Sequence, residues 1–131
     1  MKLVSVYKYK GAVKILYELL KTRPPEACIS HKKMPSYEKH KKFVRSAPYK
    51  YWYIITSDMG SVMGAIYLSR NNEIGAWTYI QGYEEQAIKL LMNKHPQKRF
   101  LANVSINHAS RMRLFEGLGF KLLQRTYEKT A

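Results

Sequence analysis

Residues 107–120 read NHASRMRLFEGLGF, and this stretch decides the fold that we expect. Apolar residues at positions 101, 104 and 106 precede it in the manner of a strand. Within it, Met112, Phe115 and Leu118 recur at helical spacing, which indicates a short helix that packs one face on a sheet. Gly117 and Gly119 follow where the end of a helix favours a residue that tolerates positive φ. Residues 120–127 then resemble another strand, so the stretch predicts a strand–turn–helix–strand unit.

The length of 131 residues predicts one domain, spanning 1–131, that is large enough to bury a sizeable core. A hydrophobic fraction of 46% excludes general disorder. The apolar runs are too short to span a bilayer, and lysines interrupt the first apolar residues, unlike a signal peptide. A single cysteine excludes an intramolecular disulfide. We therefore expect a cytoplasmic protein without membrane contact.

The net charge of +14 indicates a positive potential that concentrates anions near the protein. Lysines and arginines gather between residues 31 and 50, and again between 94 and 99. A small phosphorylated ligand, such as coenzyme A or a nucleotide-linked substrate, would explain this charge best. Nucleic acid is a second, less favoured explanation, because phosphate contacts also need distributed Lys and Arg. The third is a basic surface that only keeps the protein soluble.

The rest of the chain alternates between strand and helix patterns. The expected strands are 3–9, 51–56, 62–68, 73–80, 100–106 and 120–127, and the expected helices lie around 13–20, 37–44, 87–95 and 108–118. Ser36 is the expected N-cap of the second helix. Its inner face would carry Tyr37, His40, Phe43 and Val44. This βααβββαβαβ order predicts an α/β sandwich whose mixed central sheet is flanked by helices.

The order N-x-x-S followed by an aromatic residue and then G-F, at 107–120, closely resembles the late motif of the GNAT (GCN5-related) N-acyltransferases. The order of strands and helices is similar to that of a GNAT domain over almost the whole chain. Residues 35–75 further resemble small GNAT proteins related to amino-sugar acyltransferases. The resemblance implies acetyl-CoA as cosubstrate and a small-molecule amine as acceptor, with a nucleotide-linked amino sugar as one candidate. It also places Asn107 and Ser110 along the pantetheine arm.

The resemblance implies a pyrophosphate site at residues 81–87, where a loop opens a helix. Anions bind there because the first backbone N–H groups of a helix lack partners and its dipole favours negative charge. Gln81, Gly82 and Ala87 match the family pattern, and Tyr83 to Ala87 would face the phosphates. The inner glycines are missing, and Glu84 and Glu85 stand where phosphate oxygens would approach. Three alternatives follow: binding through the main chain, weak binding, or a GNAT fold that has lost its cofactor.

The strand that precedes this loop would hold the thioester in the family, which corresponds to Trp77, Thr78 and Tyr79. A carboxylate early on that strand can take the proton of the amine, and Glu73 occupies such a place. The alternative is that Glu73 is an exposed glutamate of a hairpin turn.

The usual proton donor to the thiolate is a tyrosine at the position that Phe115 occupies, and phenylalanine cannot donate. Tyr79 and Tyr127 are candidates by their place in the expected fold, although a structural role suits each of them as well.

Other residues with reactive side chains have ordinary explanations. His108 is expected to face solvent in a turn, and His40 to be a core histidine on an apolar face. Cys28 has no base beside it in the sequence and is expected to be a small buried residue. Trp52 and Tyr53 should fill the core or line the acceptor cleft. No set of His, Cys, Asp and Glu has the spacing of zinc ligands, so we expect no metal.

The sequence thus leads to three hypotheses. The first is an N-acetyltransferase that moves an acetyl group from acetyl-CoA to the primary amine of a small molecule. The second is a catalytically weak or inactive GNAT-like module that binds CoA or an acidic partner. The third is a basic protein that binds nucleic acid.

Overall fold

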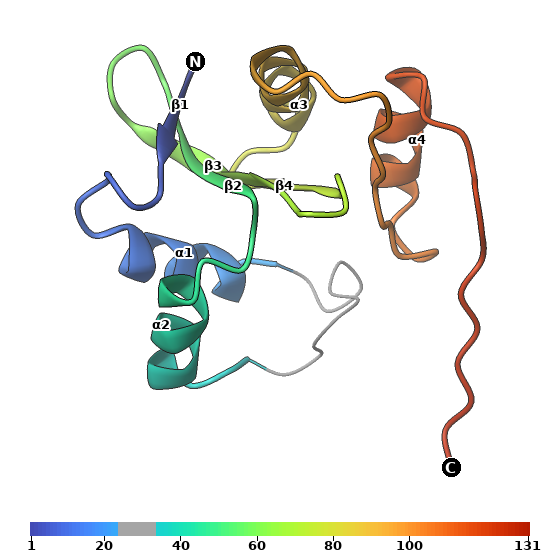
Figure 1. Ribbon diagram of the computed structural model, residues 1–131, viewed down its shortest axis with the longest axis horizontal. Coiled ribbons are helices and arrows are strands. Elements are labelled where there is room, and N and C mark those ends of the chain that lie inside the picture. Colours follow the sequence, from blue (N-terminus) through green and yellow to red (C-terminus); the bar gives the residue numbers. More distant parts are fainter. Residues whose placement is uncertain (24–33) are drawn as a thin grey trace.

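The computed structural model describes residues 1–23 and 34–131. Its strands are β1 (Lys2–Ser5), β2 (Tyr51–Thr56), β3 (Val62–Leu68) and β4 (Ile74–Thr78), and its helices are α1 (Ala12–Lys21), α2 (Tyr37–Arg45), α3 (Glu84–Lys94) and α4 (Ala109–Gly117). The strands form one sheet in the order β1-β2-β3-β4, and each strand is antiparallel to its neighbour. Helices α1 and α2 cover one face and α3 covers the other, with α4 beside the β4 edge (Figure 1). The expected α/β class is confirmed.

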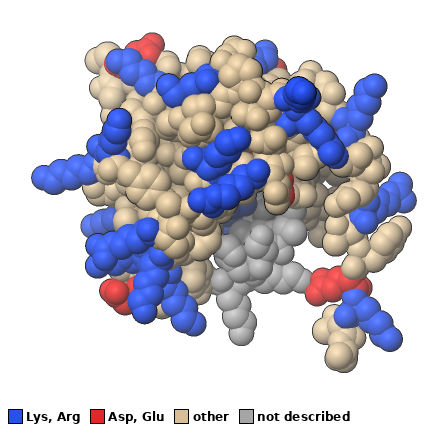
Figure 2. Space-filling model, viewed as in Figure 1, with Lys and Arg blue, Asp and Glu red and all other residues tan. Residues whose placement is uncertain are grey.

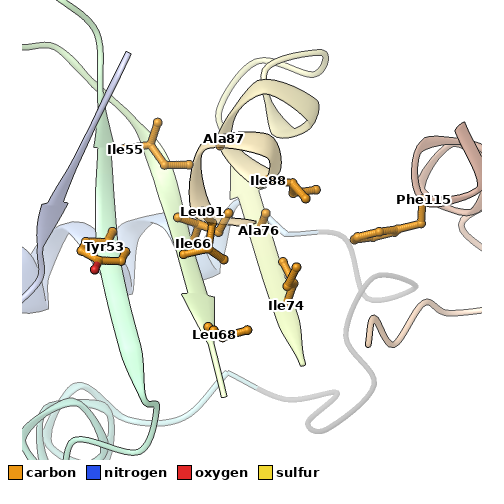
Figure 3. Packing of buried hydrophobic residues seen from close by; sticks show 10 residues of the cluster. All are labelled: Tyr53, Ile55, Ile66, Leu68, Ile74, Ala76, Ala87, Ile88, Leu91 and Phe115. Carbon is orange, nitrogen blue, oxygen red and sulfur yellow. The ribbon is translucent and has the colours of Figure 1, made fainter. Parts of the chain in front are cut away.

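The two faces of the sheet carry separate apolar clusters, because successive side chains of a strand point to opposite sides. Tyr53 and Ile55 of β2 belong to the cluster under α3, which also includes Phe115 of α4 (Figure 3). Trp52 and Ile54 belong to the cluster under α1 and α2. Fully burying one isoleucine stabilises a protein by about 1.5–3 kcal/mol. The prediction that Trp52 and Tyr53 fill the core is therefore confirmed, one on each face.

The predicted mixed sheet with strands at 100–106 and 120–127 is wrong for the described residues. Leu101 forms only an isolated parallel bridge with Glu73, and the chain beyond Phe120 has no strand partner. After the bridge the chain leaves the β4 edge, so the segment from 120 to 127 has no neighbouring strand with which to pair. It extends away from the body of the protein (Figure 1), and Leu122 and Leu123 are exposed.

Helix α2 begins as predicted. The Ser36 side chain accepts a hydrogen bond from the backbone N–H of Lys39 at 3.3 Å, which satisfies a donor of the first turn. His40 and Val44 are buried, as expected for the inner face. Tyr37 and Phe43, predicted on the same face, are exposed at 39% and 44%, so that part of the prediction is wrong. Residue Cys28 lies outside the described residues.

Within the described residues, no helix is long and apolar enough to cross a membrane.

Candidate active site

A cavity of about 540 Å³ opens where β4 and the segment after Leu101 separate. Its lining comes from helices α1 and α2, from strands β2, β3 and β4, and from residues 103–111. Its described lining consists of Leu16, Leu19, Leu20, Arg23, Pro35, Lys39, His40, Phe43, Tyr49, Trp52, Ala65, Tyr67, Glu73, Ile74, Gly75, Ala76, Trp77, Asn103, Val104, Ser105, His108 and Arg111. The early departure of the chain from the β4 edge therefore creates the space for a ligand.

Glu73 lines this cavity just before β4 begins. Its Oε2 accepts a hydrogen bond from Nδ2 of Asn103 at 2.5 Å. Its backbone N–H donates to the Ser69 hydroxyl at 2.9 Å, which fixes the turn that carries it. Glu73 is half-buried, so it is not simply an exposed turn residue. The structure thus holds a carboxylate in a fixed direction at the cavity, where it is able to accept a proton.

Trp77 is the centre of a cluster of cationic and polar groups in the cavity. The guanidinium carbons of Arg23 and Arg111 lie 5.6 and 5.7 Å from its ring centroid, within the range of a cation–π contact. Its Nε1 donates to the Thr22 hydroxyl at 3.2 Å. The ring of His108 approaches it edge-on at 6.2 Å. His108 is therefore half-buried at the cavity, and the prediction of a solvent-facing turn histidine is wrong.

Tyr49 and Tyr67 form a stacked pair in the same cavity, with ring centroids 3.7 Å apart and planes 4° from parallel. The Tyr67 ring lies against Gly75 of β4, where a Cβ atom would overlap it. Burial raises the pKa of both phenols above the ordinary value of a tyrosine. Both hydroxyls therefore stay protonated at neutral pH. The Tyr49 hydroxyl donates to that of Tyr67, so the Tyr67 hydroxyl is the one that can donate to a ligand.

The predicted pyrophosphate loop has a carboxylate folded into it. Gly82, at φ 106°, donates its N–H to Oε2 of Glu84 at 3.0 Å, and Glu84 is only 7% exposed. Glu85 instead points outward and pairs with Lys89 at 3.4 Å. Gln81 and Tyr83 are exposed, and Tyr83 provides no side-chain cap to α3. One backbone donor is thus occupied, while the first turn of α3 has no side-chain cap within the described chain.

The remaining residues predicted to face the thioester or the phosphates differ in accessibility. Ala87, on the buried face of α3, is fully buried, and its N–H donates to the Tyr83 carbonyl at 3.2 Å. Thr78 is 3% exposed and donates its hydroxyl to the Ile80 carbonyl at 2.7 Å. Tyr79 is 45% exposed and does not line the cavity. Of the predicted thioester strand, only Trp77 reaches the cavity through its side chain.

Asn107 and Ser110 lie at the start of α4, exposed and adjacent to the cavity wall. The Asn107 N–H donates to the Ser105 hydroxyl at 3.3 Å. The Ser110 hydroxyl shares a hydrogen bond of 3.2 Å with Nδ1 of His108. Both side chains are accessible to a ligand that enters along α4.

The candidate proton donors do not gather at the cavity. Phe115 is 4% exposed and packs edge-on against Phe120. Tyr127 is 85% exposed in the C-terminal segment. The pKa of Tyr79 is raised by burial and then by Glu18, which makes this phenol a weaker acid. The phenols that the structure does place at the cavity are Tyr49 and Tyr67, which the sequence did not indicate.

Within residues 1–23 and 34–131, no three His, Cys, Asp or Glu side chains come together as a metal site requires.

Solved structures with a similar fold are N-acetyltransferases. The spermidine N-acetyltransferase from Vibrio cholerae, solved in complex with CoA and spermine, aligns with a TM-score of 0.72 at 12% identity, over 90% of this chain and 79% of that one. A chimeric form of the same enzyme gives a TM-score of 0.68 at 11% identity, over 92% and 82% of the two chains. No protein-family model and no curated protein matches the sequence. This likeness establishes the fold alone, and the chain therefore has the GNAT fold.

Proposed function

We propose that the protein is an N-acetyltransferase that moves an acetyl group from acetyl-CoA to the primary amine of a small molecule. The observation that carries the proposal is the Glu73 carboxylate, held by Asn103 in a cavity at the start of β4. The GNAT fold supports it, because solved proteins with this fold include an acetyltransferase bound to CoA.

The reaction needs a neutral amine that attacks the thioester carbonyl, so that an N–C bond forms and the C–S bond breaks. Glu73 accepts the proton of the amine, directly or through one water molecule. The main chain of Trp77, Thr78 and Tyr79 would hold the thioester. Because the Tyr79 side chain does not line the cavity, the leaving thiolate would take its proton from solvent. Asn103 keeps the carboxylate aimed at the cavity by its hydrogen bond.

The rest of acetyl-CoA would lie along α4 and reach the start of α3. Asn107 and Ser110 would contact the pantetheine arm, and Gln81, Gly82 and the helix start from Tyr83 to Ala87 would face the phosphates. Glu84 weakens this site because it occupies the Gly82 N–H, whereas Glu85 points away. Lysine and arginine side chains are scattered over the face seen in Figure 2 and far outnumber acidic ones there, and their potential favours the binding of phosphates.

The finer proposal is that the acceptor amine belongs to an amino sugar linked to a nucleotide. The net charge of +14 supports it, since such a substrate carries phosphate groups.

The test combines calorimetric titration of acetyl-CoA with an assay of CoA thiol release across a set of primary amines. Replacing the proposed base, Glu73→Gln, should lower kcat by about 100-fold or more, the usual contribution of a general base. It should leave the Kd of acetyl-CoA unchanged. The matched control is Glu116→Gln, an exposed glutamate of α4. Turnover that survives Glu73→Gln would exclude this role for Glu73.

The hydrogen bond between Gly82 and Glu84 favours a second candidate function, a GNAT-fold module that binds CoA weakly without catalysis. Saturable binding of CoA, with no thiol release for any amine, would support this module over the enzyme.

A further inference from the structure

We propose that the acceptor of this cavity carries an oxyanion, a carboxylate or a phosphate, that is bound by Arg111 and Arg23 while its amine faces Glu73. The inference deepens the proposed function and rests on it, because it names the chemical class of the acceptor.

Arg111 is the first observation. It lies on α4 four residues before Phe115, and therefore on the same inward face of the helix. Its Nη1 is buried and has no hydrogen-bond partner anywhere in the described chain. None of the ion pairs of the described residues includes it. An unpaired buried donor of a charged group is costly, and a ligand oxyanion at the cavity would satisfy it.

The second observation is that two guanidinium groups share one aromatic ring. Arg23 and Arg111 both lie within 6 Å of the Trp77 centroid, and both line the cavity. Burial lowers the pKa of Arg111, and the charge of Arg23 lowers this pKa further. The negative charge of Glu84 raises it and so offsets part of the decrease. Like charges held together in a cavity destabilise it, and an anion bound to both would relieve that repulsion.

The third observation is the balance of charge in the lining. Among the described residues that line the cavity, Arg23, Lys39 and Arg111 are cationic at neutral pH and Glu73 is the one carboxylate. A polyamine would meet repulsion in such a cavity. A molecule with one amine and one acid group matches it, with the amine at Glu73 and the acid group at the arginines.

The two arginines and Glu73 line one cavity of about 540 Å³, so a small molecule in it has both kinds of group around it. Tyr49 and Tyr67 of the stacked pair each interact electrostatically with Arg23 and with Glu73. The Tyr67 hydroxyl, which accepts from that of Tyr49, can donate a further hydrogen bond to the ligand between these charged ends.

The test measures acetylation of matched amines with and without an acid group: glucosamine 6-phosphate against glucosamine, O-phosphoethanolamine against ethanolamine, and spermidine as a polycation. The phosphorylated member of each pair should have a kcat/KM about 10- to 100-fold higher, the range for charge-assisted hydrogen bonds. Arg111→Met should abolish this preference and leave the Kd of acetyl-CoA unchanged. Arg113→Gln, an exposed arginine of the same helix, should preserve it. Equal kcat/KM within the pairs, or preference for spermidine, would overturn the proposal.

A binding measurement separates failure of this inference from failure of the proposed function. If no amine is acetylated, the proposed function fails, and the tryptophan fluorescence still reports on the anion site. O-Phosphoethanolamine should change this fluorescence saturably, and Trp77→Phe should remove the change while Trp52 remains. The absence of any fluorescence response would refute the inference. Weaker acetyl-CoA binding in Arg111→Met would also refute it, because Arg111 would then contact acetyl-CoA and not the acceptor.

Thermal unfolding of Arg111→Met addresses a purely structural role. Methionine keeps the apolar packing of the side chain against Trp77 and Phe115 and removes the Nη1 that has no hydrogen-bond partner, so the midpoint should stay the same or rise. A clearly lower midpoint would show that Arg111 holds the fold together instead of waiting for a ligand.

Discussion

Oε2 of Glu84 accepts a hydrogen bond from the backbone N–H of Gly82 at 3.0 Å, in the loop that precedes α3. The carboxylate thus occupies a donor that a pyrophosphate would use, and its charge repels that anion. The repulsion is limited because the loop is open to solvent at Gln81 and Tyr83. We infer that this one side chain weakens the CoA site proposed here.

Removing this side chain should therefore strengthen CoA binding. Glu84→Gln removes the charge and Glu84→Ala also releases the Gly82 N–H, so Glu84→Ala should lower the Kd of CoA more. We expect a gain of about 10-fold, a fraction of the Coulomb energy between two charges near a protein surface. Calorimetric titration measures it. Glu85→Gln is the control, because Glu85 already points outward to Lys89, and equal gains for both residues would contradict this assignment.

Asn103 should be a positioning residue for Glu73. Asn103→Ala removes the hydrogen bond to Oε2, so the carboxylate loses its fixed direction. We expect kcat to fall about 10-fold while the Kd of acetyl-CoA is unchanged, since misaligned catalytic groups lose rate more than binding. Asn71→Ala, an exposed turn residue, is the control. An unchanged kcat in Asn103→Ala would mean that Glu73 needs no such support.

The sequence predicted the helix of residues 109–117 well, because its signals are local. Phe115 is buried and Gly119 has φ 94°, as the spacing and the glycine indicated. The role proposed for Arg111 was not predicted, although Arg111 shares the helix face of Phe115. The family motif predicts ligand contacts only for Asn107 and Ser110. The signal that could have revealed Arg111 is its spacing, because a charged residue four positions before a buried phenylalanine lies on the inward face of the helix.

The errors in the sheet have a different origin. Apolar and polar residues alternate between positions 100 and 106 as in a strand. A strand there would have to pair with β4 along its length, but only Leu101 bridges Glu73, and the Asn103 side chain bonds the Glu73 carboxylate. Pairing of this kind depends on distant residues, which single-sequence patterns do not report. The conflict between Glu84 and a pyrophosphate was visible in the sequence. The hydrogen bond to Gly82 was not, because it depends on the φ of that glycine.

Gly75 should be required for the shape of the cavity. A Cβ at this position would overlap the Tyr67 ring, so Gly75→Ala must move Tyr67 away from Tyr49. Overpacking of this kind costs about 1–3 kcal/mol of unfolding free energy. Urea unfolding measures the loss. Gly117→Ala is the control, because a Cβ there meets no atom and alanine favours a helix. A loss no greater than that of the control would show that the tyrosine pair is free to shift.

Phe115→Tyr should not create the proton donor that the resemblance to GNAT proteins implies at this position. Phe115 is 4% exposed, within the cluster under α3 and edge-on to Phe120, so a new hydroxyl would be buried without an evident partner. We expect a loss of about 1–3 kcal/mol in stability, the cost of an unsatisfied polar group, and no gain in kcat. Chemical unfolding and thiol release measure the two effects. A variant with higher kcat would place this side chain at the thioester after all.

The stability of the protein should fall in mild acid because of His95. This ring stacks on Tyr51 at 3.6 Å and shares a hydrogen bond of 2.5 Å with the Tyr53 hydroxyl. Its pKa is lowered by burial and then by Lys94 and Lys50. The unfolded chain, with a histidine pKa of about 6.5, then binds a proton at a higher pH than the folded protein does. Stability is therefore fully present above that value and decreases as the pH falls through the folded pKa.

Unfolding midpoints in urea between pH 7.5 and pH 5 should show this decrease in the wild type and a smaller one in His95→Gln. Lys50→Gln should also reduce it, because Lys50 contributes to the lowered pKa, although less than burial does. Since burial remains in Lys50→Gln, its pH dependence should lie between those of the wild type and His95→Gln. Identical pH dependence in all three proteins would assign the acid sensitivity to other groups.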